Sequence, residues 1–343
     1  MRAYSIIGIF FVLISFTLPA LAFASTAPVK SHYTRLFYYQ NTADAKASFF
    51  AHASSIDIFA PQSYKLNTDG TLSGSIAPDL RAFAKKHKIK VMPLVTNGAF
   101  SIAASEALLD DPILQEKAIT ALLLEAKNFG YAGWQFDFEQ IPANYRDKYS
   151  AFIARASIMF KAAGLISSVA VIAKVSDNPS DYKGTLWDDL VGAYDYDALA
   201  SSVDFISVMS YDDPESTGPA VELNWLNRVL AYSLLHIPPA KLSLGLALYY
   251  WARDDATGKI VGVGGNKTID KIFKKYKVTV TFDPLNKVPV LHYRAQGTTY
   301  SLYYENAKSM KEKIALVTGD HLYGFSAWSL GLEVPSIWTV VRE

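Results

Sequence analysis

The sequence predicts an α/β protein built as a (β/α)8 TIM barrel, with a small α+β insertion between strands 7 and 8. Two observations lead to this prediction. Eight strand signals, mostly separated by helix signals, run along the 343 residues, which favours a closed barrel over an open doubly wound sheet. The segment before the last strand is far too long for a single helix connection. The strands are expected at 36–39, 56–61, 90–95, within 130–141, and at 166–173, 204–211, 241–250 and 324–328.

Helix signals connect these strands. Asp111 and Pro112 form an N-cap followed by a first-turn proline, so we expect a helix that begins there and ends near Gly130. Further helices are expected at 79–88, 142–164, 186–200, 222–236 and 309–318.

The insertion, expected at 252–308, reads as a glycine-rich turn followed by three strands. The turn is expected at 260–265 and the strands at 278–282, 288–293 and 298–304. After strand 7 it would lie on the carboxyl-terminal face of the barrel, where active sites form in this fold. It would either wall one side of a groove or only stabilise the barrel.

Composition removes several classes of function. Lys+Arg 33 against Asp+Glu 32 gives no electrostatic reason to expect nucleic acid as a partner. The chain has no cysteine, its six histidines show no ligand spacing, and the dinucleotide, P-loop and zincin motifs are missing. We therefore expect no metal, no cofactor and a monomer.

The first residues predict export. A basic start at Met1 and Arg2 precedes the apolar run 6–18, and small residues at 20–22 and 22–24 fit a cleavage site. We expect a signal peptide at 1–24, a secreted, periplasmic or cell-envelope location, and a catalytic barrel over 33–343. An uncleaved anchor is the alternative, although the run is short for a membrane span.

The central strand alternates between an aromatic and a polar face. The two sets are Trp134, Phe136 and Phe138 against Gln135, Asp137 and Glu139. Both faces of a strand in a βαβ unit are covered, so buried carboxylates cost several kcal/mol unless they are paired or functional. A solvated strand end is the alternative; a catalytic acid site is the interpretation we favour.

Four segments resemble glycoside hydrolase family 18, the chitinase-like barrels, and they occur in that family's order. They are Gly133-Trp134-Gln135-Phe136-Asp137-Phe138-Glu139, Met209-Ser210-Tyr211-Asp212, the segment 241–249 (KLSLGLALY) and the segment 324–331 (GFSAWSLG). The branch most similar to this chain is the bacterial spore-cortex and cell-wall N-acetylglucosaminidase-like group. The resemblance implies hydrolysis of glycans that contain N-acetylglucosamine, either peptidoglycan or chitin.

Two positions depart from the family signature. Ala132 and Gln135 stand where the signature has aspartates. In chitinases the second of these exchanges a proton with its neighbour, whereas Gln135 can only hydrogen-bond Asp137. The cell-wall branch commonly carries an amide here, so we expect activity with an altered pH profile.

The spacing of Asp137 and Glu139 sets their chemistry. Two residues apart on one strand, their Cα atoms are about 6.6 Å apart on the same face. They cannot easily act as an acid and an opposite-face nucleophile, but they can act on a sugar whose 2-acetamido oxygen is the nucleophile. Glu139 would be the acid and base, and burial beside a carboxylate should raise its pKa. Asp137 would orient the acetamide, and Tyr211 would hydrogen-bond its carbonyl.

The remaining candidates are substrate-binding residues. They are Gln135, Met209, Asp212, Trp328, Tyr249, Tyr39 and Asn97, with Trp328 as an apolar floor under the sugar ring. Core or rim packing explains Tyr39 and Tyr249 equally well, and an Asn before Gly is often simply a turn residue.

Three classes of function remain open. The first is a secreted hydrolase of N-acetylglucosamine-containing glycans. The second is a carbohydrate-binding, lectin-like barrel that has lost catalysis, against which the presence of Glu139 argues. The third is a partner-binding barrel without a sugar ligand.

Overall fold

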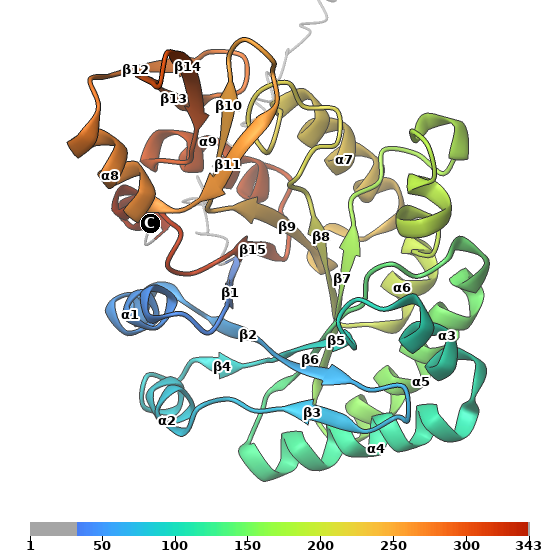
Figure 1. Cartoon of the computed structure of the whole chain (residues 1–343). Helices are drawn as coiled ribbons and strands as arrows, with labels where there is room; N and C mark the ends of the chain where they lie inside the picture. Colours follow the sequence, from blue (N-terminus) through green and yellow to red (C-terminus); the bar gives the residue numbers. More distant parts are fainter. Residues whose placement is uncertain (1–32, 342–343) are drawn as a thin grey trace, which may run out of the picture. The chain divides into compact units, whose positions relative to one another are not determined.

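The structure, a computed structural model that describes residues 33–341, is centred on a closed barrel of eight parallel strands (Figure 1). In spatial order these are β1 (Thr34–Tyr39), β15 (Gly324–Trp328), β9 (Leu242–Ala247), β8 (Phe205–Met209), β7 (Ile166–Ile172), β6 (Gly133–Asp137), β5 (Leu94–Asn97) and β2 (Ile58–Leu66). Strand β1 pairs in parallel with both β15 and β2, which closes the sheet. The predicted (β/α)8 barrel is confirmed. The predicted signal peptide lies outside the described residues.

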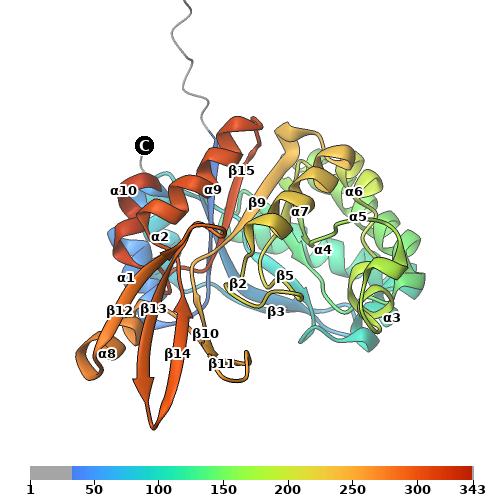
Figure 2. The same ribbon diagram turned by 90° about the horizontal axis from the view of Figure 1, so that it is seen from above.

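Helices surround the barrel (Figures 1 and 2). They are α1 (Ala43–Ala51), α2 (Pro78–Lys86), α3 (Ile102–Asp110), α4 (Pro112–Phe129), α5 (Arg146–Ala162), α6 (Tyr196–Ser202), α7 (Leu223–His236), α9 (Ala307–Gly319) and α10 (Trp338–Val341). Within residues 33–341, no helix is both long and apolar enough to cross a bilayer.

Helix α4 has the ends that the sequence predicts. The Asp111 side chain accepts hydrogen bonds from the backbone N–H groups of Ile113 and Leu114, at 2.8 and 3.3 Å. Gly130 ends the helix in the left-handed conformation, with φ 68°. The chain therefore turns directly into β6, the strand that carries the two central carboxylates.

Strand β6 separates its aromatic and polar side chains between two environments. Phe136 packs edge-on against Phe152 of α5, with ring centroids 5.6 Å apart, and the indole N–H of Trp134 donates to the Leu122 carbonyl of α4 at 3.0 Å. The aromatic face therefore holds the helix layer. Because side chains alternate along a strand, Gln135 and Asp137 point into the barrel.

The insertion forms a second, antiparallel sheet. Its strands are, in spatial order, β11 (Ile260–Gly264), β10 (Tyr250–Asp254), β14 (Thr298–Tyr303), β13 (Val288–Ala295) and β12 (Val278–Asp283), and α8 (Asn266–Lys275) packs on one face. The predicted glycine-rich turn at 260–265 is wrong, because these residues are mostly β11. A Cβ at Gly264 would lie 3.1 Å from the Tyr250 ring, so glycine here permits close strand packing.

Other elements differ from prediction in their ends. The second strand continues past Pro61 to Leu66, and the third is divided into β4 (Lys90–Val91) and β5. Pro61 does not end the strand because the sheet continues beyond it: β2 pairs with β5 from Gln62 to Leu66. Helices α1, α3 and α8 and the short strand β3 (Leu72–Gly74) lie in segments for which we predicted no such element.

Candidate active site

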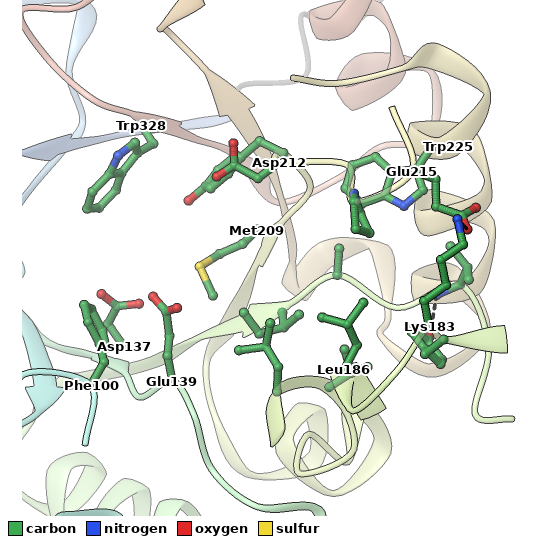
Figure 3. Close-up of a pocket in the computed structure, with 18 of the residues that line it drawn as sticks. Phe100, Asp137, Glu139, Lys183, Leu186, Met209, Asp212, Glu215, Trp225 and Trp328 are labelled. Atoms are coloured by element: carbon green, nitrogen blue, oxygen red, sulfur yellow. Dashed lines mark hydrogen bonds and ion pairs between the residues drawn. The ribbon is translucent and has the colours of Figure 1, made fainter. Parts of the chain in front are cut away.

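A cleft of about 530 Å3 lies at the carboxyl ends of the barrel strands (Figure 3). Six of the predicted site residues line it: Asp137, Glu139, Met209, Tyr211, Asp212 and Trp328. Asp137, Met209 and Trp328 are the last residues of β6, β8 and β15, so three strands far apart in sequence meet here. None of the residues that line the cleft belongs to the second sheet within 250–303.

The carboxylates of Asp137 and Glu139 lie close together at one side of the cleft (Figure 3). Asp137 is 3% exposed, and its side chain accepts one hydrogen bond, from the Gln62 amide at 3.3 Å. Glu139 is half-buried and stands beyond the end of the strand. The site thus holds two neighbouring acids with few donors to stabilise their ionised forms.

Asn97 fixes the backbone of Glu139. Its side-chain NH2 donates to the Glu139 carbonyl at 2.6 Å, and its side-chain oxygen accepts from the Glu139 N–H at 3.0 Å. The same NH2 donates to the Ser105 hydroxyl at 2.7 Å. Asn97 is buried and does not line the cleft, so the structure places it behind Glu139.

Burial raises the pKa of both carboxyls. Desolvation, then the charge of Glu139, raise the pKa of Asp137 to about 7. Desolvation, then the charge of Asp212, raise the pKa of Glu139. The direction expected for Glu139 agrees with the structure, although the charged neighbour is Asp212 on β8's side of the cleft. Near neutral pH the two carboxyls together therefore carry less than two negative charges, because they retain part of a shared proton.

Gln135 makes different contacts from those expected. Its NH2 donates to the hydroxyls of Ser168 and Ser207, at 2.8 and 2.9 Å, and not to Asp137. Ser207 in turn contacts the Ser326 hydroxyl of β15 at 2.8 Å, so hydroxyl groups meet across the inside of the barrel. The Gln135 amide therefore donates to serines beneath the cleft, and the side-chain donor to Asp137 is Gln62.

The opposite wall comes from the end of β8 and the residues that follow it. The Tyr249 hydroxyl donates to the Asp212 carboxylate at 2.5 Å, which fixes Asp212 at the cleft. Asp212 has φ 60°, and partial desolvation of its carboxyl in the cleft raises its pKa. Tyr211 is half-buried and lines the cleft, whereas Tyr249 lies behind Asp212.

Trp328 forms one end of the cleft. Its ring packs on Tyr38 with centroids 5.2 Å apart, and it faces Asp137 and Met209 across the opening (Figure 3). Tyr39, by contrast, is buried against Phe59, with its hydroxyl 3.2 Å from the Asn41 side chain, and does not line the cleft.

Sequence reasoning missed most of the other residues that line the cleft, among them Gln40, Gln62 and Phe100. Gln62 carried a usable signal. Gln62 lies two and four residues after Ala60 and Ile58, so its side chain falls on the same inward face of β2. We had taken Pro61 as the end of that strand. In residues 33–341, no cluster of three or more His, Cys, Asp or Glu side chains could hold a metal ion.

The raised pKa of Asp137 predicts a loss of stability as pH rises. From about pH 4 to 7 the unfolded state has lost this proton while the folded state keeps it, so the free energy of unfolding should fall by up to about 4 kcal/mol. Chemical denaturation at pH 4, 6 and 8 measures this fall, and in Asp137→Asn we expect it to be at least about 2 kcal/mol smaller.

The matched control is Asp188→Asn, which changes an exposed carboxylate and should keep the wild-type pH dependence. An Asp137→Asn variant that loses stability as steeply as the wild type would show that Asp137 is ionised in the folded protein.

Comparison with known proteins agrees with this geometry. The glycosyl hydrolases family 18 profile matches residues 32–333. The cortical fragment-lytic enzyme of Bacillus subtilis (strain 168) is 26% identical over 292 residues, covering 82% of this chain and 66% of that protein. The chain spans about two thirds of the length of such curated relatives.

Solved structures show the same fold. The spore cortex-lytic enzyme SleL of Bacillus megaterium has a TM-score of 0.81 at 24% identity, covering 92% of this chain and 75% of that chain. A chitinase of Chromobacterium violaceum has a TM-score of 0.79 at 25% identity, covering 91% and 98%. The family resemblance seen in the four sequence segments is therefore confirmed, and the chain belongs to the glycosyl hydrolases of family 18.

Proposed function

We propose that this glycoside hydrolase cleaves β-1,4 bonds next to N-acetylglucosamine in peptidoglycan or chitin-type glycans by a retaining, substrate-assisted mechanism. One observation carries the proposal: Asp137 and Glu139 line the same side of a cleft that has Trp328 at one end (Figure 3). Spore cortex-lytic enzymes and chitinases both occur among the relatives, which supports the two glycan classes.

Glu139 acts first as the acid. It donates its proton to the glycosidic oxygen, the bond from that oxygen to C1 breaks, and the leaving sugar departs with the proton. The substrate's own acetamido oxygen forms a bond to C1 from the opposite face, giving an oxazolinium ion. Burial raises the pKa of Glu139, which is the direction that a general acid requires.

Water then completes the reaction. The Glu139 carboxylate takes a proton from a water molecule, whose oxygen attacks C1 as the bond to the acetamido oxygen breaks. Two inversions at C1 leave the configuration unchanged. The protein needs no nucleophilic carboxylate on the far face of the sugar, which matches two acids that lie at the end of β6 and two residues beyond it.

Asp137 stabilises the charged intermediate. Its carboxyl is buried beside Glu139, which raises its pKa to about 7. A positively charged oxazolinium and its N–H would favour the ionised form of Asp137, so the interaction strengthens as the charge develops. Tyr211 donates to the acetamide oxygen, Met209 and Asp212 contact the sugar, and Trp328 provides its apolar floor.

We also propose that the enzyme acts outside the cytoplasm. The basic start and the apolar run 6–18, followed by small residues, support a cleaved signal peptide at 1–24. Both proposed glycans are located outside the cytoplasmic membrane, which agrees with export.

Removing the acid should abolish turnover and keep binding. We expect Glu139→Gln to lower kcat on a chromogenic N-acetylglucosamine oligosaccharide about 100- to 10,000-fold, with sugar affinity changed little. The matched control is Glu312→Gln, on the exposed side of α9, which should keep full activity. A wild type that binds the oligosaccharide and does not cleave it would support the lectin-like alternative.

Substrate assistance requires the acetyl group. A substrate whose reacting sugar carries a free 2-amino group should be cleaved at least about 1,000-fold more slowly, because no internal nucleophile is present. Proton NMR of the first product from the acetylated substrate should show the β-anomer before mutarotation. Initial release of the α-anomer would contradict the retaining mechanism.

A further inference from the structure

The cleft extends past the two catalytic carboxylates into a second region. We call it the apolar arm and define it by Ile172, Val175, Leu186, Leu190 and Trp225, which all line the cleft. Figure 3 shows Leu186 and Trp225 on the side of Glu139 and Met209 away from Trp328. The arm is therefore continuous with the active site and opposite the sugar floor.

The wall of the arm is almost entirely hydrocarbon. Among its five side chains, the indole N–H of Trp225 is the single polar group. Tyr182 also lines this end of the cleft, and its hydroxyl is bonded to the backbone of Val175 and Ser176. The charged residues that line this end of the cleft are exposed: Asp181, Lys183, Glu215 and Arg228. Lys183 and Glu215 form an ion pair at 2.9 Å with side chains 77% and 50% exposed, which places these charges at the rim.

Buried contacts hold this wall in place. Lys174 is fully buried, and its ammonium donates to the Asp177 carboxylate at 2.5 Å and to the Tyr194 carbonyl at 3.0 Å. It also lies 5.0 Å from the Trp187 ring centroid, next to Leu186 in the chain. The Tyr182 hydroxyl accepts from the Val175 N–H at 3.1 Å. The arm is preformed, so little ordering opposes binding.

We propose that the apolar arm binds an apolar substituent (alkyl, acyl or aryl) carried by the leaving group of the substrate. The inference rests on the proposed function. Glu139 protonates the oxygen between the sugar over Trp328 and the leaving group, so whatever lies beyond Glu139 belongs to the leaving group.

A bare sugar ring gains less from this wall than an apolar group does. Its hydroxyls would leave water for five side chains that offer one donor, and unpaired buried hydroxyls oppose binding. An apolar group gains affinity from the same surface because its own hydration is unfavourable. The arm therefore selects substrates by what is attached to the leaving sugar or alcohol.

A series of alkyl β-chitobiosides tests this directly. Methyl, butyl, hexyl and octyl glycosides have leaving alcohols of nearly equal basicity, so differences in kcat/KM report binding of the chain. We expect kcat/KM to rise about threefold for each methylene that enters the arm, measured below the critical micelle concentration.

Two variants locate the effect. Leu186→Asn and Leu190→Asn are each expected to lower the octyl-to-methyl ratio of kcat/KM at least tenfold. The matched control is Ile158→Asn, an exposed aliphatic residue on α5 that does not line the cleft, which should keep the wild-type ratio. Circular dichroism and Tm identify any variant that fails to fold, and the other leucine variant then decides.

The outcomes separate the arm from the reaction. The proposal would be overturned if kcat/KM of an active enzyme did not change with alkyl chain length. It would also be overturned if the rise in kcat/KM with chain length persisted in both leucine variants. If no glycoside is hydrolysed, the proposed function fails, and calorimetry on Glu139→Gln still decides: binding of the octyl glycoside at least tenfold more tightly than the methyl glycoside supports the arm, and equal binding contradicts it.

Discussion

The burial of the Asp137 carboxyl with a single, long hydrogen bond from Gln62 is the constraint on which the active site rests. A carboxylate that is poorly solvated and next to Glu139 holds a proton near neutral pH. The protein could have stabilised the anion with the Gln135 amide, but that amide bonds to serines. Under the proposed mechanism, the anion is stabilised by the charged intermediate, so binding would be strongest where charge develops.

The barrel makes this arrangement possible because its strands bring rigid groups together. Asn97 at the end of β5 clamps both backbone polar groups of Glu139 after β6, which keeps the acid in register with Asp137. Tyr249 holds Asp212 on the opposite wall, and Lys174 anchors the segment after β7. The contacts of Asn97 and Tyr249 join neighbouring strand ends, and none of these three supporting side chains lines the cleft, so the site is preorganised from behind.

Sequence predicted the barrel and the catalytic strand because both follow local rules: alternation places Asp137 and Glu139 on one face, and capping signals bound α4. The side-chain contacts between different strands could not be predicted from the sequence. The partners of Gln135 come from β7 and β8, and the clamp by Asn97 comes from β5. The helix α8, in the insertion, lies where we predicted no helix, since its packing depends on a sheet formed by distant residues.

A crystal structure of Glu139→Gln with an N-acetylglucosamine oligosaccharide tests the central claim most directly. The account predicts the reacting sugar over Trp328, its acetamido oxygen about 3 Å from C1 and its N–H on the Asp137 carboxyl. An acetamide turned away from C1, with a water or another carboxylate on that face instead, would contradict substrate assistance. The same map would show where the leaving group lies.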